Sequence, residues 1–99
     1  MNEVKTHEVT VFLERPGVLG YSTAILEVAR GDQIHWKSDF PFAVEFQGVS
    51  PCERRKGASD KGALRMKVRG DAGSGVYKYF VAAYANGAVV TDDPVIIIE

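Results

Sequence analysis

A strict alternation of apolar and charged side chains in the second half of the chain constrains the fold most. Three apolar residues alternate there with three cations: Leu64, Met66 and Val68 with Arg65, Lys67 and Arg69. Successive side chains of a β-strand point to opposite faces of the sheet. The pattern therefore predicts a half-buried strand with an apolar inner face and a basic outer face.

Turn residues recur along the chain and divide it into short segments. They lie at 15–17, 30–32, 38–41, 70–75, 86–87 and 92–94. Asn86-Gly87 predicts a type I′ hairpin, because both central positions of that turn need a positive φ. No segment has a sustained helical period, and the long irregular connection over 48–62 has room for one short helical turn. This spacing predicts an all-β fold, a Greek-key β-sandwich or barrel of about seven strands.

The length and composition set the class of protein. The chain of 99 residues is long enough for one domain, so we expect a single domain over residues 1–99. The longest apolar run near the end, Val95 to Ile98, is far too short to cross a bilayer, and the polar start lacks the apolar core of a secretory signal. The lone cysteine, Cys52, cannot form an internal disulfide, which fits a reducing compartment. We therefore expect a cytoplasmic protein with no membrane partner.

Three stretches of the chain resemble segments of the cupredoxins, and of plastocyanin in particular. In residues 28–36 a Gly-Asp turn leads into a strand that ends in an aromatic residue. Residues 39–44 resemble the loop in which the first copper histidine follows a proline, and residues 75–81 resemble the strand that delivers the copper cysteine. This resemblance covers most of the chain and implies a cupredoxin-like β-sandwich.

The same resemblance implies that the copper ligands are missing. It places the first histidine on Phe42, the cysteine on Val81 and the second histidine on Tyr84, while residues 86–88 occupy the region of the axial methionine. A blue-copper site needs two imidazoles and a thiolate. We therefore expect a scaffold without copper or another cofactor, and the electron-transfer function of the family does not carry over.

The remaining ligand-type residues are His7, His35 and Cys52. His35 alternates with two apolar neighbours and should point outward, and no two of the three have the spacing of a metal-ligand pair. We expect no metal site. Asp92-Asp93 precedes Pro94, and adjacent strand residues point to opposite faces, so we expect a break between two strands there and not a pair of catalytic carboxylates.

Cys52 is the one candidate for nucleophilic chemistry. It is followed closely by Arg54, Arg55 and Lys56, and nearby cations lower the pKa of a thiol and make it reactive. The alternative is a loop cysteine without a chemical function. Phe40, Pro41, Phe42 and Tyr84 are expected to gather at the end of the sandwich where copper sits in the family. They either fill the vacated site or form a small recognition patch.

Charge is distributed unevenly along the chain. The net charge is −1, but residues 54–69 sum to +6 and all other residues to −7. Seven cations make up this basic region: Arg54, Arg55, Lys56, Lys61, Arg65, Lys67 and Arg69. Cations along a strand either protect a sheet edge from pairing or attract an acidic surface. No aromatic residue interleaves them, which argues against nucleic acid.

Two functions from different classes follow from these observations. The first is a non-enzymatic module that binds an acidic protein partner through the basic region. The alternative is a small thiol-dependent redox or ligand-binding protein that uses Cys52. The identity of the partner and the oligomeric state have no signature in the sequence.

Overall fold

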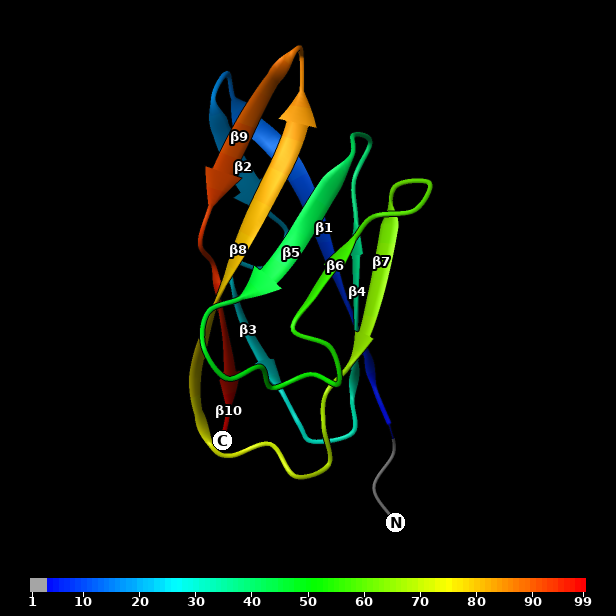
Figure 1. Cartoon of the computed structure of the whole chain (residues 1–99), viewed down its shortest axis with the longest axis vertical. Coiled ribbons are helices and arrows are strands. Elements are labelled where there is room, and N and C mark those ends of the chain that lie inside the picture. The colour runs from blue at the N-terminus through cyan, green and yellow to red at the C-terminus, as the bar shows by residue number, and fades with distance from the viewer. Residues whose placement is uncertain (1–3) are drawn as a thin grey trace.

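Ten strands form two sheets that pack face to face (Figure 1). The structure is a computed structural model that describes residues 4–99. The strands are β1 (Thr6–Arg15), β2 (Val18–Tyr21), β3 (Ile25–Val28), β4 (Gln33–Lys37), β5 (Phe42–Phe46), β6 (Lys56–Ala58), β7 (Ala63–Lys67), β8 (Gly75–Ala85), β9 (Ala88–Asp92) and β10 (Val95–Ile98). Sheet I has the order β2-β1-β4-β7, and sheet II has the order β3-β10-β8-β5-β6, with β9 also paired to β8. The predicted all-β sandwich is confirmed.

The strand count exceeds the expected number of about seven, and two of the additional strands are the short segments β2 and β6. β2 follows the turn at residues 15–17 and forms a hairpin with β1. β6 lies within the connection over 48–62, where it pairs with β5. The expectation of a helical turn in that connection is wrong, since no helix occurs within residues 4–99, and so none there that could span a membrane.

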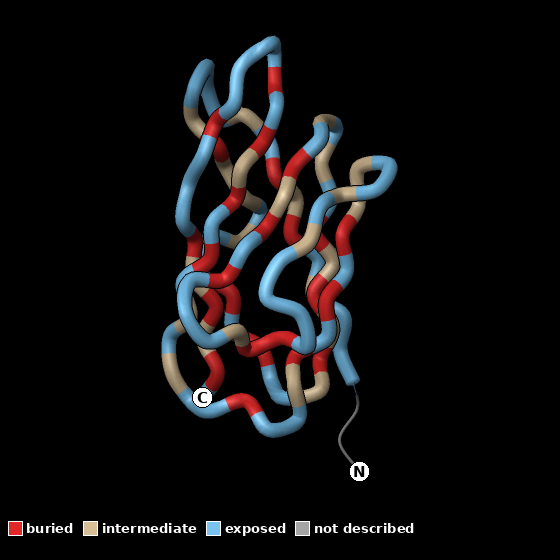
Figure 2. Tube along the Cα trace, in the orientation of Figure 1, coloured by how far each residue is buried: buried red, intermediate tan, exposed pale blue. Residues whose placement is uncertain are grey.

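Burial follows the alternation seen in the sequence, and Figure 2 shows buried and exposed positions succeeding each other along the strands. In β7, Leu64 and Met66 are buried while Arg65 and Lys67 are exposed, as predicted. At the centre of the core the indole Nε1 of Trp36 donates to the Tyr79 hydroxyl at 3.3 Å. Because of this hydrogen bond, the two large aromatic side chains can be buried without leaving the indole N–H unsatisfied.

Asp32 connects the turn between β3 and β4 to the start of β1 through hydrogen bonds. Its buried carboxylate accepts hydrogen bonds from the backbone N–H groups of Lys5 and Ala29, at 3.1 and 3.0 Å, and lies 2.8 Å from His7 Nε2. Burial by itself raises the pKa of Asp32, but the hydrogen bonds from His7, Ala29 and Lys5 outweigh it and lower the pKa. The carboxylate therefore stays ionised at neutral pH.

β8 is shared by two successive strands. Its first half, Gly75 to Lys78, pairs with β10, and its second half, Val81 to Ala85, pairs with β9. The break between β9 and β10 falls at residues 92–94, as predicted. The hairpin between β8 and β9 has positive φ at both Asn86 (53°) and Gly87 (79°), which is the backbone of the predicted type I′ turn.

Candidate functional site

The fold collects the seven basic residues along one long edge of the sandwich, where β6 ends sheet II and β7 ends sheet I (Figure 1). We call this set the basic edge. Arg54 and Arg55 precede β6, Lys56 begins it, Lys61 lies in the turn to β7, and the other three lie in or just after β7. The sequence separates these residues by up to fifteen positions, and the close approach of two sheet edges brings them together.

A glycine allows the two edge strands to approach. A Cβ atom at Gly57 of β6 would lie 2.9 Å from Leu64 Cδ1 and 3.2 Å from Met66 Cε of β7. Any side chain at this position would force the ends of the Leu64 and Met66 side chains to shift. Arg54 crosses the same junction, and its Nη2 donates to the backbone oxygen of Arg65 at 2.8 Å.

The outer edge of β7 is already covered by the protein itself. The backbone N–H of Glu53 donates to Lys67 O at 2.9 Å, Arg54 occupies the Arg65 oxygen, and the turn Asp60–Ala63 closes on itself with two backbone hydrogen bonds. Exposed sheet edges are templates for pairing with another chain, and covering them prevents it. The loop before β6 and the Arg54 guanidinium therefore perform the edge protection considered for the whole basic region.

Three of the seven cations have partners in this arrangement. Arg54 binds the backbone as described, Arg55 forms an ion pair with Glu45 across β5 and β6, and Arg69 Nε donates to Ser50 O at 3.1 Å and pairs with Asp71 at 3.4 Å. Among residues 4–99, no carboxylate lies within 4.0 Å of the other four. These are Lys56, Lys61, Arg65 and Lys67, all exposed, which we call the free cations.

One end of the basic edge opens into a shallow hollow of about 430 Å³. Lys61 lines it together with Phe40, Pro41 and Ser59. The hollow thus places an ammonium group beside apolar and hydroxyl surface, and the Asp39 carboxylate also lines it. It lies where the β4–β5 connection meets the turn between β6 and β7, because Ser38 N donates to Gly62 O at 2.9 Å.

The positions that the resemblance assigns to copper ligands hold no ligand atoms. Phe42 and Val81 are buried, and Phe40 packs against the core beside them. Tyr84 differs in burial: the residue is 56% exposed on the outer face of sheet II, and its backbone N–H donates to Pro41 O at 2.9 Å, so it lies at the expected end of the sandwich without entering the core. The buried Phe42 side chain offers neither nitrogen nor sulfur as a copper ligand.

Cys52 lies in the core and not in an accessible loop. Its residue is 2% exposed, and it forms a bridge with Val68 of the strand region after β7. Burial raises the pKa of the thiol to about 12, and this outweighs the opposite effect of Arg69 and Arg54. The position of Cys52 does not support the interpretation as a reactive thiol, because the nearby cations do not compensate for the lost hydration.

The two histidines serve separate structural contacts. His7 binds Asp32, and His35 points outward on sheet I, as predicted, where its Nδ1 lies 3.7 Å from Glu8 Oε1. Lys37 also pairs with Glu8, at 3.0 Å, and this contact lowers the pKa of the Glu8 carboxyl. Within residues 4–99, no three His, Cys, Asp or Glu side chains gather as a metal site would require.

The outer face of sheet II carries several exposed apolar side chains, a feature not found from the sequence. Five of the eight exposed large apolar side chains within residues 4–99 lie on it: Ile25, Val76, Phe80, Tyr84 and Val89. Ala82 and Ala43 lie side by side between Phe80 and Tyr84. Lys56 of β6 lies opposite Glu45 of β5, and Glu45 lies opposite Phe80 of β8. The free cation Lys56 therefore borders this face.

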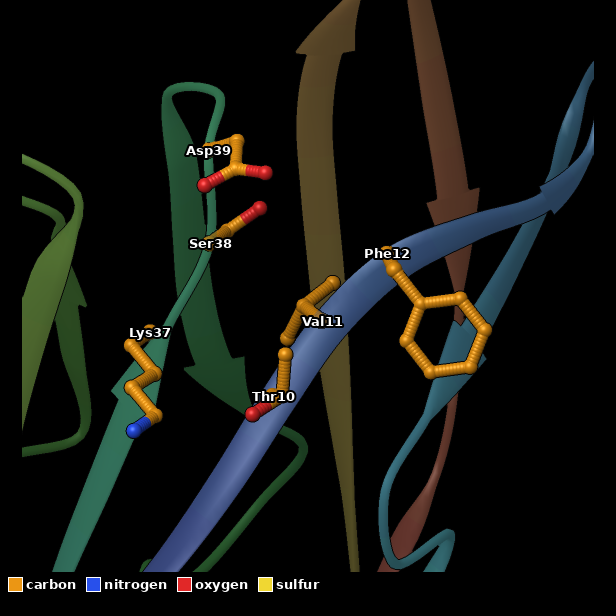
Figure 3. Close-up of a pocket in the computed structure, with 6 residues that line it drawn as sticks. All are labelled: Thr10, Val11, Phe12, Lys37, Ser38 and Asp39. Atoms are coloured by element: carbon orange, nitrogen blue, oxygen red, sulfur yellow. The ribbon is translucent and has the colours of Figure 1, made fainter.

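A further hollow, of about 320 Å³, opens where β1 and the end of β4 diverge (Figure 3). Ser38 and Asp39 line it from the β4 side, and Val11 lines it from β1. Figure 3 shows the Phe12 ring pointing away from Ser38 and Asp39. The ring lies over Gly20 of β2, because a Cβ added there would be 2.6 Å from Phe12 Cε2. The hollow is lined by one cation, Lys37, and one carboxylate, Asp39, so it has no excess of either charge.

Comparisons with known proteins agree with the architecture. No family model matches the chain, and no curated protein matches it. The fold is similar to the solved structure of a novel purple cupredoxin from Nitrosopumilus maritimus, with a TM-score of 0.59 at 17% identity, over 94% of this chain and 99% of that one. At this identity the likeness shows the fold alone. Residues 4–99 therefore have the fold of a cupredoxin-like β-sandwich, and the positions that the resemblance assigns to the strong copper ligands hold Phe42, Val81 and Tyr84.

Proposed function

We propose that this chain is a non-enzymatic interaction module that binds an acidic protein partner through the basic edge. The observation that carries the proposal is the presence of four free cations on an edge where the backbone of β7 is already covered. The outer edge of β7 needs no further charge for its protection, since the loop before β6 and Arg54 satisfy it. Charges without an internal partner are available to steer an oppositely charged surface.

The surroundings of the free cations supply the apolar contacts that a specific interface also needs. Lys61 lines the hollow formed with Phe40 and Pro41, and Lys56 borders the apolar face that carries Phe80 and Tyr84. Protein interfaces combine an apolar, aromatic-rich centre with a polar rim. The free cations would supply the rim and the on-rate, while the aromatic side chains would supply most of the affinity.

The thiol-dependent alternative is not supported by the position of Cys52. A nucleophilic thiol must be ionised and reachable, whereas the Cys52 side chain is buried and its pKa is raised to about 12. No observation on the described residues favours this second function.

The direct test measures binding of a fluorescein-labelled poly-Glu peptide by fluorescence anisotropy. The variant Lys61→Glu/Arg65→Glu reverses two free cations, and the control Lys5→Glu/Lys78→Glu makes the same change in net charge with exposed lysines elsewhere. We expect the edge variant to bind at least about tenfold more weakly than the wild type, with the control nearly unchanged. Equal weakening in both variants would mean that net charge alone attracts the peptide, and the proposal would fail.

A further inference from the structure

The edge opposite the basic edge carries a groove of opposite charge. This groove, of about 510 Å³, lies between β2 of sheet I and the segment that joins β9 to β10 in sheet II. Glu14, Asp92 and Asp93 supply carboxylates to its lining, and Ile25 and Pro94 supply apolar surface. In Figure 1, β2 and β9 lie on the left of the molecule and β6 and β7 on the right.

Two carboxylates of the groove have no cationic partner among the described residues. Asp93 lies 4.0 Å from the Lys78 ammonium, but within residues 4–99 no cation lies within 4.0 Å of Glu14 or Asp92. The Tyr21 hydroxyl, which also lines the groove, is shielded from water, and burial together with the nearby Asp92 carboxylate raises its pKa.

A lysine side chain matches these features. Its ammonium has three donors and no acceptor, and its methylene stem packs on apolar surface while the charge stays in polar surroundings. We infer that this acidic groove receives lysine or arginine side chains from the basic edge of a second copy of the chain. The inference rests on the proposed function, because it names the acidic surface that the basic edge binds.

Charge complementarity favours a second copy as the occupant. The molecule holds free cations along β6 and β7, and it holds the unpaired carboxylates of Glu14 and Asp92 at the ends of β1 and β9, so each copy presents both halves of one contact. Because the two halves lie on opposite edges, no molecule can satisfy its own groove. Such a contact is heterologous, and it builds head-to-tail chains of copies instead of a closed symmetric dimer.

The experiment is sedimentation velocity of the full chain over a concentration series up to about 1 mM, at about 20 mM and about 500 mM NaCl. We expect the average mass of the wild type to rise with concentration without stopping at the dimer, and to return to the monomer at high salt. The variant Glu14→Lys/Asp92→Lys should associate at least about tenfold more weakly. The control Glu27→Lys/Glu99→Lys has the same net charge and should associate like the wild type.

A wild type that stays monomeric at low salt, or a groove variant that associates like the control, would overturn the inference. The poly-Glu assay separates this failure from failure of the proposed function. A groove variant that no longer associates but still binds poly-Glu supports both ideas. If the wild type is monomeric and yet binds poly-Glu through Lys61 and Arg65, the proposed function stands and the acidic partner is a different protein.

Discussion

The junction between β6 and β7 makes a quantitative prediction for Gly57→Ala. The new methyl group would lie 2.9 Å from Leu64 Cδ1, closer than real Cβ contacts are found, and Leu64 is itself buried among core residues. Overpacking of a core by a methyl group costs about 1–3 kcal/mol. Replacing glycine returns about 0.4–1 kcal/mol by restricting the unfolded chain. The net loss should be about 1–2 kcal/mol in the free energy of unfolding.

Urea denaturation followed by the fluorescence of Trp36 measures this loss. The chain has one tryptophan, and it lies at 0% exposure beside Tyr79, so its emission reports the packing of both sheets. The matched control is Gly70→Ala, where an added Cβ meets nothing within 4 Å. The control should leave stability unchanged or raise it slightly, while Gly57→Ala lowers the thermal midpoint by at least about 4 °C.

A double-mutant cycle assigns the loss to the contact itself. Leu64→Ala alone should cost about 2–5 kcal/mol, because it leaves a cavity. In the double variant the methyl group introduced at position 57 occupies part of that cavity, so the combined loss should be smaller than the sum by about 1 kcal/mol. If the two losses simply add, or if Gly57→Ala behaves like Gly70→Ala, the reasoning about a tight junction is refuted.

Three further predictions concern buried groups. Phe42→Ala should lower the free energy of unfolding by about 3–5 kcal/mol in urea denaturation, whereas Tyr84→Ala, at an exposed position, should change it by under about 0.5 kcal/mol; similar losses would contradict the assigned burial. The folded-state pKa of Asp32 is lowered, so its stabilisation is complete above the ordinary value of 3.8 and is lost as the pH falls through the folded pKa. Asp32→Asn should therefore cost about 2 kcal/mol at about pH 7 and little at the acid end of a pH series of unfolding curves, and a pH-independent cost would count against this account. Cys52 should react with iodoacetamide at about pH 8 about a thousandfold more slowly in the folded chain than in denaturant, from its pKa of about 12 against 9.0, and a rate near that of the denatured chain would show that the thiol is accessible.

The sequence was sufficient for features that arise within one strand or one turn. The alternation around Met66 determined which face of β7 is buried, and Asn86-Gly87 determined the hairpin backbone. Such patterns are local, because side-chain direction in a strand and φ in a turn depend on immediate neighbours. β6 was missed because its three residues, Lys56 to Ala58, carry no apolar alternation and are extended only through pairing with β5.

The candidate site was predicted as a set of residues but not as a surface. The seven cations could be counted, but the engagement of Arg54 with β7 and of Arg55 with Glu45 depends on how two sheet edges meet. The burial of Cys52 was missed for a related reason. Its loop runs along the end of β7, and the resulting loss of hydration is a tertiary effect that neighbouring residues in the sequence do not reveal.

The position of β10 between β3 and β8 has a consequence for biosynthesis. The strand is made last among those of sheet II, yet it occupies an interior place there, in parallel to β3 and antiparallel to the first half of β8. Until residues 95–98 leave the ribosome, both neighbours have unpaired backbone edges, and such edges invite association with other chains. Sheet II therefore cannot be completed strand by strand during translation. The pairing of β3 with β8 through β10 must wait until β10 is available. We expect the nascent chain to be most prone to aggregation before that point.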